Sequence, residues 1–115
     1  MANSFPPIFT DTEKMLQYLY TIIRKIANTE KYTLGAQIRE SAVLFYALIR
    51  KSYYTYNKPE KLKTLNEAKL ELDKLQVEIR LALAIGAMKD IKNHQKIGEM
   101  LGHISEQLRA WSSHC

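Results

Sequence analysis

The segment Leu65-Asn-Glu-Ala-Lys-Leu-Glu-Leu-Asp-Lys-Leu75, which continues to Ile79-Arg-Leu-Ala82, decides the fold of this chain. Its apolar residues recur at alternating steps of three and four, at Leu65, Ala68, Leu72, Leu75, Ile79 and Ala82. This period gives a helix one continuous apolar stripe, as in the seam of a helical bundle. Asn57-Lys58-Pro59 precedes the segment, and proline fits the first turn of a helix. We therefore expect a long helix that starts at this proline and ends near Gly86.

Three further segments have the same period. Thr10-x-x-Glu13 has the pattern of a capping box, and it precedes the periodic residues Leu16, Leu19 and Ile26. A second stripe comprises Leu34, Ile38, Ala42, Phe45, Ile49 and Tyr53. The last stripe follows Asp90, a residue type preferred at N-caps, and comprises Ile97, Leu101, Ile104, Leu108 and Trp111. The sequence predicts helices over 11–28, 33–56, 59–87 and 90–112 in one domain, 1–115. Their short connections indicate an all-α, up-and-down antiparallel four-helix bundle.

The run from Ala42 to Ile49 contains eight apolar residues without a polar interruption. In a helix such a run is apolar on every side, so it exceeds what the core of a single bundle requires. Surplus apolar surface favours an interface with another subunit or partner. Alternatively, the small Ala42 and Ala47 and the hydroxyl of Tyr46 are tolerable on an exposed face.

The composition indicates a soluble cytoplasmic protein. The chain has 115 residues, a formal net charge of +5 and a single cysteine, Cys115. One cysteine cannot form an intramolecular disulfide, which suits a reducing compartment. The first residues lack the pattern of a signal peptide, and no apolar run approaches the length of a membrane span.

Positive charge is concentrated between Arg50 and Lys63, where five cations accompany only Glu60. Three tyrosines are interleaved with these cations. Cations attract phosphates and tyrosine faces stack on unpaired bases, so the segment suits single-stranded nucleic acid. Alternatively, the cations complement a helix dipole and the tyrosines cover the end of the bundle. Two more arginines join the candidates: Arg39, which shares a helix face with Arg50, and Arg80 in the third helix. The candidate nucleic-acid-binding residues are therefore Arg39, Arg50, Lys51, Lys58, Lys61, Lys63, Arg80, Tyr53, Tyr54 and Tyr56.

Other polar features have plain structural interpretations. Arg24 and Lys25 complement the dipole at a helix end, and Lys89, Lys92 and Lys96 form a solvated row. Gly98 and Gly102 interrupt the last helix, which predicts a close approach of a neighbouring helix. The histidines lack metal-binding spacing, and no phosphate loop or activated nucleophile occurs. We expect no catalytic residue, metal or cofactor.

An ordered series of segments resembles one small protein family. The series comprises Tyr18-Leu-Tyr-Thr-Ile-Ile-Arg-Lys25, Glu30-Lys-Tyr-Thr-Leu-Gly-Ala-Gln-Ile38, the Leu65–Ala82 segment and Trp111. It is similar to the accessory variability determinant (Avd) proteins of diversity-generating retroelements and the related intervening-sequence proteins, over roughly residues 16–111. In the part of the third helix where the family commonly has two arginines one turn apart, Arg80 matches the second and Gln76 replaces the first.

The resemblance implies a non-enzymatic accessory protein that binds a reverse transcriptase and its RNA template or nascent complementary DNA. It also implies a homo-oligomer, a pentameric ring, and a contact of Arg80 with nucleic acid or polymerase. A second hypothesis is an intervening-sequence-type interaction protein without a nucleic-acid role.

Overall fold

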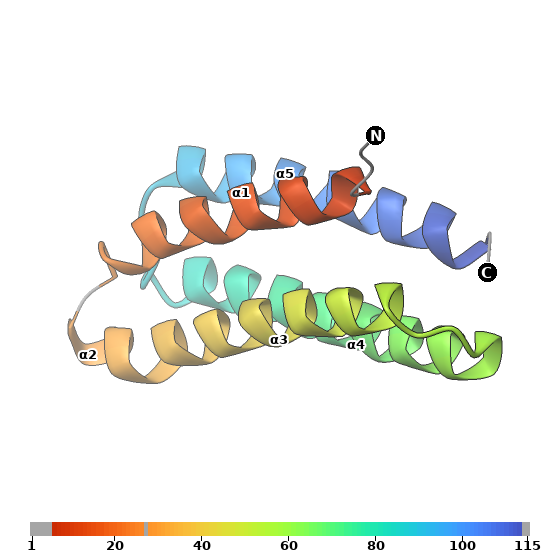
Figure 1. The fold of residues 1–115 in the computed structure, drawn as a ribbon. Helices are drawn as coiled ribbons and strands as arrows, with labels where there is room; N and C mark the ends of the chain where they lie inside the picture. The colour runs from red at the N-terminus through yellow and green to blue at the C-terminus, as the bar shows by residue number, and fades with distance from the viewer. Residues whose placement is uncertain (1–5, 27, 114–115) are drawn as a thin grey trace.

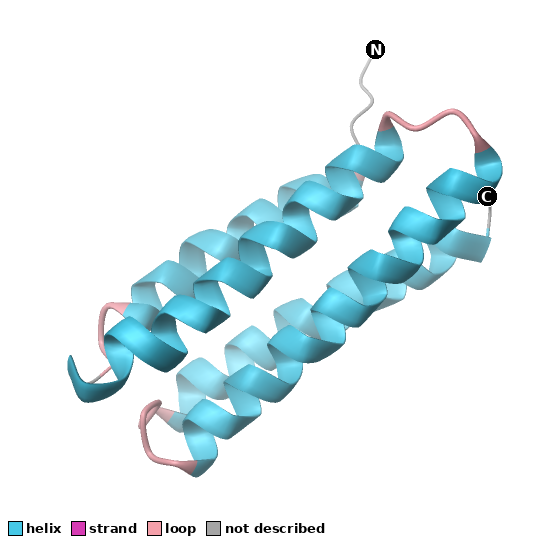
Figure 2. Ribbon diagram, turned by 90° about the horizontal axis from the view of Figure 1, so that it is seen from below, coloured by secondary structure: helices cyan, strands magenta, loops and turns pink. Residues whose placement is uncertain are grey.

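Four main helices form an up-and-down antiparallel bundle, as the sequence predicts (Figures 1 and 2). A computed structural model describes residues 6–26 and 28–113. The main helices are α1 (Pro7–Ile23), α3 (Ala36–Tyr53), α4 (Lys58–Ala84) and α5 (Ile91–Ser113). One short helix, α2 (Asn28–Glu30), and a π-helical turn, η1 (Lys31–Gly35), lead directly into α3. The described residues contain no strand.

The helices lie in two layers, α1 with α5 and α3 with α4 (Figure 1). α1 begins and α5 ends at the same end of the bundle, beside the turn between α3 and α4. At the opposite end, α1 finishes and α4 passes into α5. The molecule extends 44 Å along its longest axis, so these two ends are well separated.

The predicted stripes form the core. All six seam residues of α4, from Leu65 to Ala82, are buried. They meet the buried residues of α3 and α5, which include Ile38, Phe45 and Ile104. At the edges of this core, Tyr53 and Trp111 are half-buried. Burial of large apolar side chains contributes about 1.5–3 kcal/mol each, so this core as a whole stabilises the bundle strongly.

The start of the first helix differs from the prediction. No side chain caps α1, whose first turn contains Pro7, so the capping box at Thr10 is wrong. The amide of Phe9 donates to the carbonyl of Pro6 at 3.1 Å, which closes a turn before Thr10. Ile8 and Phe9 are buried, and their burial explains why the helix begins early. α1 also ends at Ile23, before the predicted Asn28.

The second helical segment begins before the predicted Thr33. Asn28 already starts α2, and the chain remains helical through η1 into α3. The hydroxyl of Thr33 donates to the carbonyl of Glu30 at 3.3 Å, so its side chain supports a continuing turn instead of a start. Leu34 is buried in this turn, as the apolar period requires.

The connections that flank α4 follow their residue chemistry. The backbone amide of Glu60 donates a hydrogen bond to Asn57 Oδ1 at 3.0 Å, so Asn57 caps α4. Pro59 lies in the first turn of this helix. After Ala84, Gly86 adopts a φ of 81°, which glycine tolerates and which ends helices. The amide of Lys92 then donates to Asp90 Oδ1 at 2.9 Å, which confirms Asp90 as the cap of α5.

The two glycines of α5 contradict their prediction. Gly98 and Gly102 are exposed, and an added Cβ at either position would meet no atom within 4 Å. Among the described residues, no neighbouring helix comes within 4 Å of such a Cβ. Within the described chain, the cost of these glycines to helix stability therefore has no compensating contact.

Candidate nucleic-acid interface

The turn between α3 and α4 presents most of the predicted basic residues. Arg50 and Lys51 lie in the last turn of α3, and the other lysines follow at the start of α4. We define the basic turn as Lys51, Lys58, Lys61 and Lys63. Lys61 is half-buried and the other three are exposed. The cap at Asn57 fixes the direction of α4, so these cations gather at one end of the bundle.

Two of the three candidate tyrosines are open to solvent. Tyr56 is 99% exposed and Tyr54 is 59% exposed. The ring of Tyr53 instead packs edge-to-face on Phe9, with centroids 5.2 Å apart. Tyr54 packs on Tyr53 in turn, at 5.0 Å. Tyr56 is thus the ring best placed to stack on an unpaired base, and Tyr53 supports the end of the bundle.

Arg50 belongs to an aromatic cluster that joins three helices. Its guanidinium lies 5.1 Å from the centre of the Phe9 ring, and Phe9 contacts Trp111 of α5 at 5.9 Å. Arg50 Nη1 also donates to the hydroxyl of Tyr46 at 3.2 Å. The Tyr46 hydroxyl donates to Glu13 Oε2 of α1. The sequence predictions missed this cluster; Phe9 and Trp111, aromatic residues near the two chain ends, were its only signal.

These contacts change the acidity of their members. Burial first, and then the hydrogen bond to Glu13, raises the pKa of the Tyr46 hydroxyl above its ordinary value, although Arg50 opposes this shift. The hydrogen bond with Tyr46 raises the pKa of Arg50. Arg50 therefore remains a cation with several aromatic and hydroxyl contacts of its own.

The remaining candidates, Arg39 and Arg80, lie away from the basic turn. Arg39 is exposed near the start of α3, about 18 Å along the helix from Lys51. Arg80 is exposed near the end of α4, about 26 Å along that helix from Lys63. Arg80 borders a shallow groove with His94 and Gly98 of α5. The structure therefore brings the basic turn together but separates both arginines from it.

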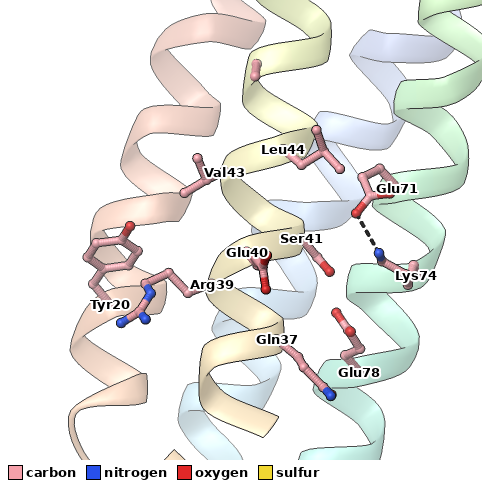
Figure 3. A pocket seen from close by; sticks show the side chains of 11 residues that line it. Tyr20, Gln37, Arg39, Glu40, Ser41, Val43, Leu44, Glu71, Lys74 and Glu78 are labelled. Carbon is pink, nitrogen blue, oxygen red and sulfur yellow. Dashed lines mark ion pairs between the residues drawn. The ribbon is translucent and has the colours of Figure 1, made fainter. Parts of the chain in front are cut away.

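A larger groove lies on the outer side of α3 and α4 and has a different character (Figure 3). Its volume is about 610 Å³, and Val43 and Leu44 of α3 line it while 45% and 46% exposed. Across the groove, Lys74 pairs with Glu71 at 2.9 Å, and Glu78 Oε1 is buried without a hydrogen-bond partner. Carboxylates repel phosphates, whereas exposed apolar side chains suit protein contacts. This groove is a better protein interface than a nucleic-acid interface.

The part of the chain that the structure describes contains neither a cluster of metal-binding side chains nor a membrane-spanning helix. Over residues 6–26 and 28–113, no group of three or more metal-binding side chains occurs. None of the helices described is long and apolar enough to span a membrane. His114 and Cys115 lie outside the described residues.

The bundle with a basic turn defines the class: a small, positively charged helical protein. The profile of the bAvd-like family matches residues 8–115, nearly the whole chain, and the chain belongs to this family. The predicted resemblance to Avd proteins is thereby confirmed, and the chain is an Avd-type protein. No curated protein matches the sequence.

Proposed function

We propose that this protein is a non-enzymatic accessory factor of a diversity-generating retroelement. In this role it binds the element's reverse transcriptase together with template RNA or nascent complementary DNA, and so supports mutagenic reverse transcription in the cytoplasm. Membership of the bAvd-like family carries the proposal. Arg80, implied as a contact by the family resemblance, stays a candidate ligand.

The basic turn supports the nucleic-acid part of the proposal. Lys51, Lys58 and Lys63 expose their charges at one end of the bundle, with the ring of Tyr56 fully open between them in the sequence. Lysines that neutralise phosphates and a ring that stacks on a base are the elements of sequence-tolerant binding to single strands. Affinity for RNA is then expected to fall steeply as salt is raised.

Exposed apolar residues support the proposed self-association, for which the family resemblance implies a pentamer. Val43, Leu44 and Ala47 lie on the outside of α3 and realise the predicted surplus of apolar surface. The outer side of α4 adds Leu70, Val77 and Leu81, also exposed. The groove between these helices also holds the unpartnered Glu78 oxygen, to which a neighbouring subunit could donate. Burial of such groups in a subunit interface removes apolar surface from water.

Assembly is the proposed mode of action. Several identical subunits present several basic turns, so a polymerase–template complex can be held at more than one point with a high effective concentration. A positive surface also complements a polymerase that carries an anionic template.

Co-expression with the reverse transcriptase encoded nearby, followed by pull-down with and without template RNA, tests the proposal. We expect the polymerase to be retained, and retention to weaken in the Lys51→Glu/Lys58→Glu variant. The matched control is Lys14→Glu/Lys69→Glu, which changes the net charge equally at the middle of α1 and α4. An assembled wild-type protein that retains no polymerase under either condition would overturn the proposal and favour an intervening-sequence-type interaction protein.

A further inference from the structure

A second group of cations lies where α1 finishes and α5 begins. Figure 1 shows that this end of the bundle is opposite the turn between α3 and α4. Lys25 follows the last turn of α1, and Lys89 precedes α5. Both line a groove of about 360 Å³, together with Asp90 and Asn93. These lysines are far apart in the sequence, and the fold brings them to one rim.

The groove has an apolar floor beneath this basic rim. Ile22 and Ile26 come from α1 and its C-terminal turn, and Ala87 and Met88 come from the connection before α5. All four side chains are buried. The rim therefore stands on a packed base, so the positions of Lys25 and Lys89 are set by the core.

Tyr18 orders the α5 side of this end. Its hydroxyl donates to Asn93 Oδ1 at 2.8 Å and ties α1 to α5 beside the groove. The ammonium of Lys96 lies 4.7 Å from the centre of the Tyr18 ring, a cation–π contact. Burial, followed by the charge of Asp90, raises the pKa of Tyr18, which keeps its hydroxyl a donor. The ring thus holds Lys96 next to the groove without neutralising it.

Little negative charge offsets these lysines. Asp90 Oδ1 already accepts the amide of Lys92 as the cap of α5. With the residues that the structure describes, Lys25, Lys89, Lys92 and Lys96 form no ion pair. The positive field at this end is therefore available to an anionic ligand.

We propose that Lys25, Lys89 and Lys96, with Lys92 one helical turn before Lys96 on α5, form a second binding surface, which takes the phosphodiester backbone of single-stranded nucleic acid. This inference extends the proposed function, because it adds a site at the end remote from the basic turn. Along α4, four carboxylates lie between the two ends, on Glu67, Glu71, Asp73 and Glu78, against two cations, Lys69 and Lys74. Lys74 pairs with Glu71, and the net negative charge of this stretch disfavours a continuous phosphate track. One subunit therefore holds two separate strand segments instead of one.

Two charge-reversal variants separate the surfaces. Lys25→Glu/Lys89→Glu alters only the far end, and both positions lie outside the helices, so the fold is expected to persist. Lys51→Glu/Lys58→Glu alters the basic turn, and Lys14→Glu/Lys69→Glu is the control with the same charge change. The probe is a fluorescently labelled single-stranded RNA oligonucleotide, titrated by anisotropy at several salt concentrations. Circular dichroism and light scattering establish that fold and assembly are unchanged.

We expect both the far-end variant and the basic-turn variant to bind RNA more weakly. Each variant removes two lysines, and each lost single-strand phosphate contact contributes about 0.7 to the steepness of log K against log salt, so the slope becomes shallower by about 1.4. The control is expected to retain the wild-type slope. If only the basic-turn variant loses affinity, the second surface is overturned and the proposed function stands. Loss confined to the far-end variant would support the second surface and exclude the basic turn. A wild-type protein that binds no RNA would overturn both surfaces.

Discussion

The guanidinium of Arg50 lies 5.1 Å from the centre of the Phe9 ring, so the first turn of α1 holds a residue that is a candidate for nucleic-acid binding. The same guanidinium lies 5.8 Å from the ring centres of both Tyr46 and Tyr54. Cation–π contacts of this kind stabilise the fold. A change at Arg50 therefore alters stability as well as charge, whereas the exposed Lys51 reports on charge alone.

Phe9→Ala is expected to lower the free energy of unfolding by about 3–5 kcal/mol, because it empties a fully buried ring site and removes the contacts with Tyr53 and Trp111. Chemical denaturation measures the loss. Tyr56→Ala is the matched control at the same end of the bundle, and its exposed ring predicts almost no change. Equal stabilities of the two variants would contradict the packing role of Phe9.

Tyr56→Ala is expected to weaken the binding of single-stranded RNA by about 1–3 kcal/mol, the usual cost of one lost base–aromatic contact. Tyr53→Ala serves as the comparison, since the half-buried Tyr53 packs on Phe9 and its loss lowers stability. Anisotropy titration at fixed salt gives the affinities. Unchanged affinity in a folded Tyr56→Ala protein would remove stacking from the proposed interface.

Leu44→Asp is expected to shift the assembly toward monomers, because it places a charge among the exposed apolar residues of α3. Light scattering after size exclusion measures the mass. Ile91→Asp, a similarly exposed apolar residue at the start of α5, is the control and is expected to leave the mass unchanged. A wild-type protein that is monomeric at tens of micromolar concentration would contradict self-association itself.

Gly98→Ala and Gly102→Ala are each expected to raise stability by about 1 kcal/mol, since alanine is the better helix former and open space surrounds both positions. Thermal and chemical denaturation measure the gain. Destabilisation, or loss of the oligomer, would instead indicate that another subunit packs closely on these glycines.

Stability is expected to fall as the pH rises above about 10, the ordinary pKa of tyrosine. The folded protein raises the pKa of Tyr46 and Tyr18, so it retains their protons in a range where the unfolded chain releases them. Their contribution is complete below that pH and is lost as the pH rises through the folded-state pKa values. Denaturation midpoints between pH 8 and 11 test this, and the Tyr18→Phe/Tyr46→Phe variant is expected to show a shallower decline.

The sequence predicted the bundle well wherever one local period was sufficient. The stripe from Leu65 to Ala82 is buried at every step because helix geometry alone fixes which residues share a face. Pro59 in the first turn of α4 and the cap at Asp90 are likewise local and were predicted correctly. The start of α1 failed because the burial of Phe9 depends on Trp111, which belongs to the last helix.

The candidate site was less predictable for the same reason. Lysines that are close in the sequence, such as Lys58 and Lys61, also lie close in space, and the sequence therefore identified them as a group. It could not reveal that the Phe9 ring of α1 contacts Arg50, or that Arg39 and Arg80 lie away from the basic turn. Nor could it bring Lys25 beside Lys89, since their proximity requires the packing of α1 on the connection before α5.

The start of α1 and the end of α5 lie at the same end of the bundle as the turn between α3 and α4. A fluorescent protein or affinity tag joined to the start of α1 or to the end of α5 would therefore lie at the same end of the bundle as the basic turn. The connections around Lys25 and Lys89 lie at the other end, well away from such a fusion. For studies of the basic turn, the better reporter is a dye or cross-linker attached within a connection at the end of Lys25 and Lys89. Tags at the chain ends suit studies of the surface around Lys25 and Lys89.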